Sequence, residues 1–222
     1  MANRSYLYAT DTIPTKGQPN PSYGLAEYNW DIPVVFKLMM ANEPRRTASA
    51  IWNHDIGIIA DRRGSQDRVE AFAKLLIEKH PHAKELEAQL KEMRDVLGKT
   101  PPTRYLLLEV GEIVDMMDGE LATNVEEVIS GIPDVVKLAA DAKTVAKWRK
   151  QKLDEMNLGY WSDVLYFDLP KPLDRPTKPS IPELTVAKPA KKKAAPKKKP
   201  APKKKPAPKK KPAKKTSVKK RR

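Results

Sequence analysis

Apolar residues recur every three or four positions on both sides of Pro81, which is the spacing of one face of an α-helix. The first set is Val69, Phe72, Ala73, Leu76 and Ile77, and the second is Leu86, Leu90, Met93 and Leu97. Each set predicts an amphipathic helix, and Pro81 should separate the two because proline interrupts a helix. Further helices are predicted over residues 32–41, 44–52, 111–117, 124–130 and 133–152.

Strands are predicted where apolar residues alternate with others or form runs too short for a helix. These runs cover residues 5–10, 56–60, 104–110 and 164–169. Short strands among several helices favour an α/β or α+β fold, with one helix-rich domain built on a small mixed sheet. The domain is expected to cover residues 1–169, a length that can bury a sizeable core.

The composition changes after residue 169. Residues 170–187 hold five prolines, which predict a semi-rigid linker. Residues 188–222 hold 19 Lys and Arg residues and no acid. We expect this lysine-rich tail to be disordered, because it has little apolar surface to offset its ordering entropy and its like charges repel one another.

The formal net charge of +15 combines parts of opposite sign. Residues 1–169 hold 21 Lys and Arg residues against 26 Asp and Glu residues, so the predicted domain is mildly acidic. Since the excess of positive charge lies at the C-terminal end, polyanion binding is expected there and not on the domain.

A cluster of three lysines recurs every six residues from Lys197, with Pro-Ala-Pro between clusters. An extended chain of this kind can follow the phosphates of DNA and release their counterions. The repeat has no arginine, aromatic or amide side chain to read bases, so binding without sequence preference is predicted. The residues expected to bind are Lys191, Lys192, Lys193, Lys197, Lys198, Lys199, Lys203, Lys204, Lys205, Lys209, Lys210, Lys211, Lys214, Lys215, Lys219, Lys220, Arg221 and Arg222.

In its lysine, alanine and proline content, the tail resembles the tails of linker histones and of bacterial histone-like proteins. The resemblance covers residues 188–222 and implies association with the nucleoid. Two alternatives to DNA stay open. The tail could bind another polyanion, such as an anionic lipid or an acidic protein, or it could be a solvated charge run without a defined partner.

The rest of the chain resembles a family of uncharacterised bacterial proteins. The resemblance rests on the opening Met-Ala-Asn-Arg-Ser-Tyr-Leu-Tyr and on residues 24–33 and 159–166. It implies a bacterial, cytoplasmic protein and brings no activity with it. A cytoplasmic location also agrees with the sequence, which has no apolar run of transmembrane length and no apolar stretch typical of a signal peptide.

The sequence offers few residues for catalysis or cofactor binding. It has no cysteine, no glycine-rich phosphate-binding motif and no Gly-x-Ser-x-Gly motif. The three histidines are His54, His80 and His82, and nothing in the sequence brings a further ligand to them. We therefore expect no cofactor, no metal and no enzymatic activity.

Residues 109–134 contain eight acids and neither lysine nor arginine. Glu109, Glu112 and Asp115 recur every three positions and could share one helical face. Such a face could be solvated, could bind a cation or exchange protons, or could dock a basic partner. Together with Trp30, Asp31 and Trp161, these acids are the candidates for a ligand pocket or docking site.

Three hypotheses follow from these features. The first is a non-enzymatic, nucleoid-associated protein that binds DNA through its tail and carries a domain of unknown specificity. The second is a regulatory or immunity-type module whose acidic segment, residues 109–134, docks a basic protein. The third is an enzyme of a class that the sequence does not reveal.

Overall fold

The computed structural model describes residues 3–151 and 158–172 of the 222-residue chain. Across these residues, six strands form one sheet in the order β3-β4-β5-β1-β2-β6. They are β1 (Arg4–Thr10), β2 (Ser22–Asn29), β3 (Arg45–Thr47), β4 (Gly57–Asp61), β5 (Tyr105–Glu109) and β6 (Tyr160–Trp161). The five pairs of neighbouring strands are all antiparallel.

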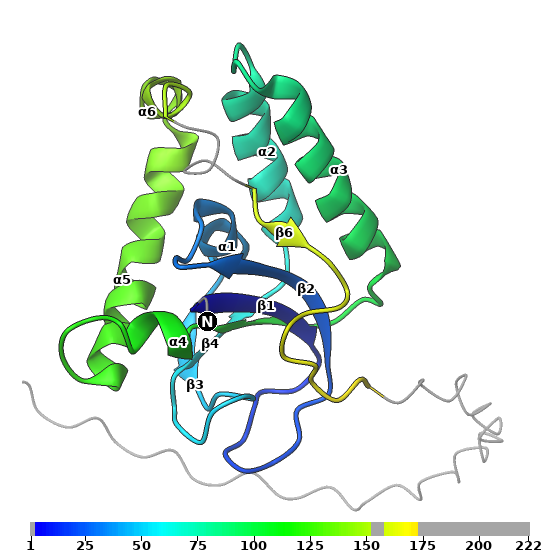
Figure 1. The fold of residues 1–222 in the computed structure, drawn as a ribbon, viewed down its shortest axis with the longest axis vertical. Helices are drawn as coiled ribbons and strands as arrows, with labels where there is room; N and C mark the ends of the chain where they lie inside the picture. Colours follow the sequence, from blue (N-terminus) through cyan, green and yellow to red (C-terminus); the bar gives the residue numbers. More distant parts are fainter. Residues whose placement is uncertain (1–2, 152–157, 173–222) are drawn as a thin grey trace, which may run out of the picture. The chain divides into compact units, whose positions relative to one another are not determined.

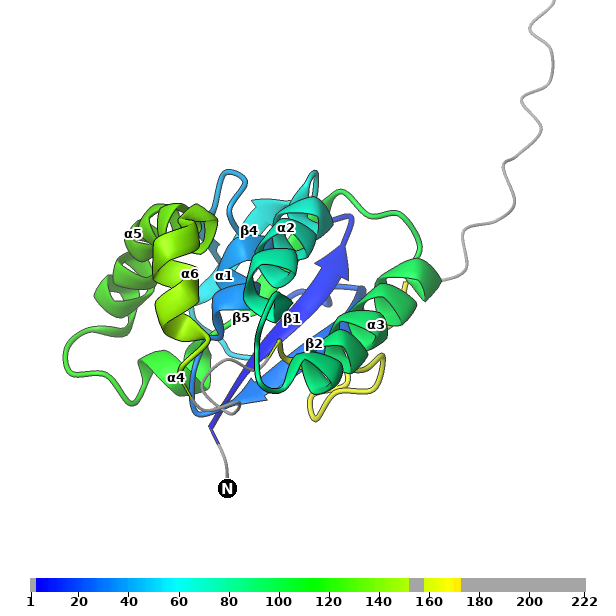
Figure 2. The same ribbon diagram turned by 90° about the horizontal axis from the view of Figure 1, so that it is seen from above.

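Six helices accompany the sheet over the same described residues. They are α1 (Val34–Met39), α2 (Ser65–Ile77), α3 (Ala83–Lys99), α4 (Gly111–Val114), α5 (Leu121–Ala140) and α6 (Ala142–Trp148). Figures 1 and 2 show α1, α2 and α3 over one face of the sheet, with α5 and α6 beside them. Helices gathered on one side of an antiparallel sheet make this an α+β domain. The predicted fold class is confirmed, although the described strands pair antiparallel throughout and do not form a mixed sheet.

Strand β1 lies inside the sheet, and both of its faces are covered. Leu7 and Ala9 belong to the core on the helix side, whereas Tyr6 and Tyr8 belong to a second core on the opposite side. All four residues are buried. A strand covered on both faces does not alternate apolar with polar residues, which explains its nearly continuous apolar and aromatic sequence.

Helices α2 and α3 confirm the two amphipathic helices predicted around Pro81. Their buried residues include the four apolar positions Val69, Phe72, Ala73 and Leu76 of α2 and Leu86, Leu90, Met93 and Leu97 of α3. These faces pack with the helix side of the sheet in one core. On their outer surface, an ion pair between Glu70 and Arg94 joins the two helices.

The second face of the sheet is covered by irregular chain. Its core consists of Tyr6, Tyr8, Ile59, Tyr105, Leu107 and Leu165. Partly buried residues of two segments pack on it, the loop after β3 and residues 162–169, which follow β6 in Figure 1. The Tyr8 hydroxyl donates a hydrogen bond to the Phe167 carbonyl oxygen at 2.9 Å, and the Phe167 ring meets the Tyr6 ring edge-on.

The helix predicted over residues 44–52 is wrong. The short edge strand β3 occupies its first half, with Thr47 opposite Gly57 of β4. In a helix, the Ala50 N–H would donate to the Arg46 carbonyl oxygen. It donates instead to the Glu109 carboxylate at 2.6 Å, so a distant acid determines the conformation of this segment.

The strand predicted over residues 164–169 is also wrong. The last strand of the described residues is β6, which pairs with Ala26 and Glu27 of β2. Residues 164–169 alternate between exposed and covered positions because Leu165 and Phe167 lie on the second face of the sheet. Their alternation thus reflects packing of a loop onto the sheet and not pairing within it.

Two further boundaries differ from the sequence prediction. Two separate helices were predicted over residues 124–130 and 133–152. In the structure, α5 instead runs through the exposed Pro133 and ends at Ala140, and α6 follows it. Burial of Val125, Ile132 and Ala139, seven residues apart, keeps one face of α5 on the core despite the proline. Strand β2 begins at Ser22 and was not predicted, because its apolar residues do not alternate regularly.

Residues 173–222, which include most of the predicted linker and the whole lysine-rich tail, lie outside the described residues. Among the helices of the described residues, none has the length and apolar character needed to cross a membrane.

We expect Tyr8→Phe to lower the free energy of unfolding by about 1 kcal/mol, because the partly buried hydrogen bond from the Tyr8 hydroxyl to the Phe167 carbonyl oxygen is lost. Urea denaturation of both proteins measures the difference. Tyr166→Phe is the matched control, since the Tyr166 side chain is 61% exposed and its change should be nearly neutral. Equal stability of Tyr8→Phe and the unsubstituted protein would show that this bond does not hold residues 162–169 on the sheet.

Candidate functional site

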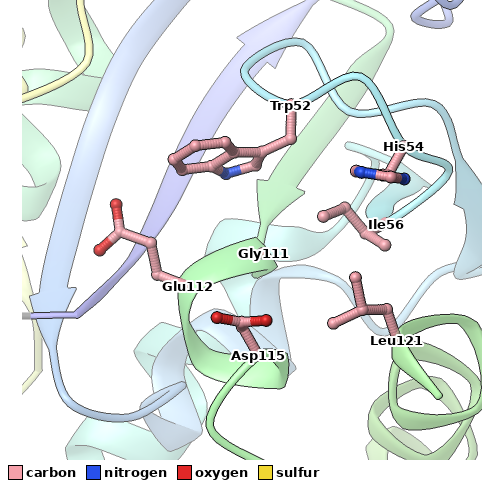
Figure 3. A pocket seen from close by; sticks show the side chains of 7 residues that line it. All are labelled: Trp52, His54, Ile56, Gly111, Glu112, Asp115 and Leu121. Carbon is pink, nitrogen blue, oxygen red and sulfur yellow. The ribbon is translucent and has the colours of Figure 1, made fainter.

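A pocket of about 210 Å³ opens where β5 leads into α4, beside the loop between β3 and β4. Figure 3 shows its lining side chains arranged around Gly111. The lining residues are Trp52, His54, Ile56, Gly111, Glu112, Asp115 and Leu121. Three of them come from the loop between β3 and β4, two from α4, Asp115 from the position directly after α4, and Leu121 from the start of α5.

The wall formed by Trp52 depends on the absence of a side chain at position 111. A Cβ atom there would lie 2.6 Å from Cδ1 and 2.7 Å from Nε1 of Trp52, which is closer than carbon and nitrogen atoms approach. The indole ring also meets the Phe167 ring edge-on, with 5.6 Å between ring centroids. Trp52 is thus positioned by two contacts while 38% of its surface remains exposed.

Behind this wall, the buried Glu109 carboxylate holds the loop that carries Trp52. The Ser49 hydroxyl donates to Glu109 Oε2 at 2.5 Å, and the Ala50 N–H donates to Oε1 at 2.6 Å. Ser49 Oγ accepts hydrogen bonds from the backbone N–H groups of Ile51 and Trp52. One carboxylate at the end of β5 therefore orders four consecutive residues of the loop.

Glu109 is completely buried, and within residues 3–151 and 158–172 it forms no ion pair. Burial raises its pKa to about 7, because the ionised form loses its hydration. The hydrogen bonds from Ser49 and Ala50 act in the opposite direction, since they stabilise the ionised form. The carboxyl group therefore changes its protonation near neutral pH.

Two tyrosines of β1 share this face of the sheet with Glu109. Burial raises the pKa of both Tyr6 and Tyr8, and the nearby carboxylates of Glu112 and Glu109, respectively, raise it further. Both hydroxyls consequently stay protonated and act as hydrogen-bond donors. The Tyr6 hydroxyl donates to Glu112 Oε1 at 3.0 Å, and the Arg4 backbone N–H donates to Oε2 at 2.8 Å. Glu112 therefore connects α4 to β1.

The acidic segment divides into buried, paired and unpaired groups. Glu126 forms an ion pair with Arg46 at 3.0 Å, and Asp134 forms one with Lys137 at 3.0 Å. The exposed acids without an ion pair among the described residues are Asp115, Asp118, Glu120 and Glu127. Asp115 is the one of these four that lines the pocket.

The structure brings together some of the candidate residues and separates others. Glu112 and Asp115 line the pocket, and Glu109 lies behind it. Trp161 packs edge-on against Phe36 on the helix side of the sheet and donates its indole N–H to the Leu158 carbonyl oxygen. It cannot share a pocket with Glu109, which faces the opposite side.

Trp30 and Asp31, directly after the end of β2, do not line this pocket either. The Trp30 side chain is largely exposed, and the Asp31 carboxylate accepts the backbone N–H of Ile32 at 2.6 Å. The structure therefore does not bring the candidates Trp30, Asp31 and Trp161 together with Glu109 at this pocket. The aromatic side chain that does line the pocket is Trp52, which the sequence analysis placed in a helix.

Sequence reasoning missed Ser49, Trp52, His54, Ile56 and Leu121. One signal was available, because Gly111 directly follows a buried strand and a glycine there can mark a close approach of another group. In the described part of the chain, His, Asp and Glu residues nowhere form a group of three that could hold a metal ion.

Residues 11–150 match a protein family described as a domain of unknown function, DUF7822. The chain belongs to this family. The matched region includes all seven residues of the pocket, together with Ser49 and Glu109, but not the opening residues, the closing segment or the tail. Comparison with curated proteins and with solved structures gives no match.

The family region ends before Phe167 and begins after Tyr6, although both residues pack near the pocket. In this chain, part of the support for Trp52 and Glu112 thus comes from outside the family region. The pocket itself, however, is built from the family region alone.

We expect the stability difference between the unsubstituted protein and Glu109→Gln to depend on pH. The pKa of Glu109 is higher in the folded state than the ordinary value of 4.5. Its contribution is therefore fully present below pH 4.5 and is lost as pH rises through about 7. At about 1.4 kcal/mol per pKa unit, the unsubstituted protein should lose about 3 kcal/mol relative to Glu109→Gln across this range.

Urea denaturation of both proteins at pH 5, 6, 7 and 8 measures this difference. Groups that titrate elsewhere affect both proteins equally and cancel in the comparison. A difference that stays constant from pH 5 to pH 8 would contradict the raised pKa of Glu109.

Proposed function

We propose that this protein is a non-enzymatic, nucleoid-associated protein that binds DNA without sequence preference through residues 188–222. The observation that carries the proposal is the separation of charge along the chain. The tail has 19 Lys and Arg residues and no acid, so every charge in it attracts phosphate. Lysines provide point charges without the planar fork that arginine uses to recognise guanine, which fits binding to the phosphate backbone.

The charge of the domain supports the assignment of DNA binding to the tail. Residues 1–169 have more acids than bases, and Asp115, Asp118, Glu120 and Glu127 expose charges that repel phosphate. The tail would thus hold the domain near DNA while the acidic surface remains available to another partner. In this proposal the protein acts in the bacterial cytoplasm.

A second candidate function is the docking of a basic protein on the acidic segment, residues 109–134. The unpaired acids at its surface favour this function, because an exposed cluster of one sign steers an oppositely charged partner. Glu109 has no part in such docking, since it is buried and already bonded to Ser49 and Ala50. The two functions are compatible, because they use different parts of the chain.

A full-length variant with a neutralised tail tests DNA binding. In this variant all 19 Lys and Arg residues of positions 188–222 are replaced by glutamine, which preserves length and proline spacing. We expect its affinity for an arbitrary DNA duplex at low salt to fall by at least about 100-fold. For the unsubstituted protein, affinity should fall by about 10³ to 10⁵ between 50 and 200 mM salt if the tail contacts six to ten phosphates.

Electrophoretic shift of duplex DNA across a salt series measures both effects. The matched control is a full-length protein whose tail has the same residues in shuffled order, and it should bind as tightly as the original. Undiminished binding by the neutralised-tail variant would refute the proposal. Loss of binding in the shuffled control would show that the order of the tail residues, and not only their charge, determines binding.

A further inference from the structure

We propose that the pocket around Gly111 binds the side chain of an arginine from a basic protein segment. The inference deepens the second candidate function and rests on it, because it names the group that the acidic segment would recognise. It does not depend on DNA binding by the tail.

The size and walls of the pocket suit an aliphatic stem with a planar end. Its volume of about 210 Å³ is that of a cleft for one long side chain and is small for a nucleotide or cofactor. Trp52, Ile56 and Leu121 supply apolar surface, which can cover the methylene groups of arginine. Gly111 adds no side chain to the pocket, which lets the Trp52 ring lie directly against the backbone there (Figure 3).

The charges at the pocket favour a cation. Asp115 is exposed at the pocket and has no ion pair among the described residues. Glu112 accepts hydrogen bonds from the Tyr6 hydroxyl and the Arg4 backbone N–H, which are both uncharged donors, and among the described residues it forms no ion pair. A carboxylate next to a partly exposed indole ring is a combination that binds cations through both ion pairing and cation–π attraction.

Among the cationic side chains, arginine fits this site better than lysine. A guanidinium group is planar, stacks on aromatic rings and is less strongly hydrated than an ammonium group. It can therefore lie against Trp52 while it donates to Asp115. The remaining unpaired acids, Asp118, Glu120 and Glu127, lie on the same segment and would attract neighbouring positive charges of the partner.

The site is preorganised, because Trp52 is held in position before a ligand binds. Ser49 Oγ accepts the backbone N–H of Trp52, the Glu109 carboxylate accepts the Ser49 hydroxyl, and the Phe167 ring contacts the indole ring. A binding group that is already held in place does not have to be ordered when the ligand arrives. The buried carboxylate thus contributes to binding through the loop and does not touch the ligand.

The probe for this proposal is a short neutral peptide with one arginine, compared with the same peptide carrying citrulline, which has the same shape and no charge. The protein is the full-length chain with the neutralised tail, so that tail residues cannot compete for the acidic site. Two-dimensional NMR of the indole N–H groups follows binding, and Trp52→Phe identifies the Trp52 signal. We expect the arginine peptide to shift the Trp52 signal in a saturable manner and the citrulline peptide to leave it unchanged.

Two variants locate the binding site. Asp115→Asn should weaken binding of the arginine peptide about three- to fivefold, which corresponds to the loss of one exposed ion pair. Asp118→Asn makes the same change of charge at an exposed acid that does not line the pocket, and it should weaken binding less than twofold. Gly111→Ala, whose methyl group would displace Trp52, should abolish the shift while the other indole signals keep their positions.

The outcomes separate the pocket from the second candidate function. Equal weakening by Asp115→Asn and Asp118→Asn would overturn the pocket and leave a diffuse acidic docking surface. Equal binding of a lysine peptide would overturn the preference for a guanidinium group. Absence of any shift with the arginine peptide would overturn the arginine site. Docking of a whole basic protein is measured separately by titration calorimetry, and that result decides the second candidate function independently.

Discussion

The structure around the pocket depends on the burial of one carboxylate. Glu109 ends β5 on the face of the sheet opposite the helices, where it has no solvent-accessible surface and no ion pair within the described residues offsets its charge. An unpaired charge in such a place is costly unless donors surround it. The Ser49 hydroxyl and the Ala50 N–H meet this requirement. The loop after β3 therefore passes over the end of β5, and this path places Trp52 at the pocket.

The two faces of the sheet are covered by different kinds of structure. The helix side holds the larger core and accounts for the amphipathic α2 and α3. The second face is covered by two irregular segments, and their side chains meet in the contacts of Phe167 with Tyr6 and Trp52. The helix side thus contributes most of the core, while the loop after β3 places Trp52 against α4 and the start of α5 to complete the candidate binding site. DNA binding, by contrast, is proposed for the tail on the basis of charge, and in that proposal the domain would be available to a second partner.

The sequence predicted those elements whose residues reveal their own surroundings. The spacing of Val69 to Leu76 and of Leu86 to Leu97 reports a helix with one buried face, and the apolar run of β5 reports a buried strand. The segment 44–52 could not be predicted in this way. Its conformation is imposed by Glu109, which is 60 positions from Ser49, and local helix preference gives no sign of that contact. The pocket could be predicted only in part for the same reason. Glu112 and Asp115 were recognised from their spacing, but Trp52 reaches the pocket through the long-range contact between Ser49 and Glu109.

The pKa of Glu109 is the most direct measure of this account, because burial and hydrogen bonding act on it with opposite sign. A ¹³C NMR titration of the glutamate carboxyl groups, with Glu109→Gln to assign the signal, measures it in the intact protein. The expected value is about 7, and Ser49→Ala should raise it further because the ionised form loses a donor. A pKa near the ordinary value of 4.5, unchanged in Ser49→Ala, would contradict the claim that a buried carboxylate holds the loop and its tryptophan in place.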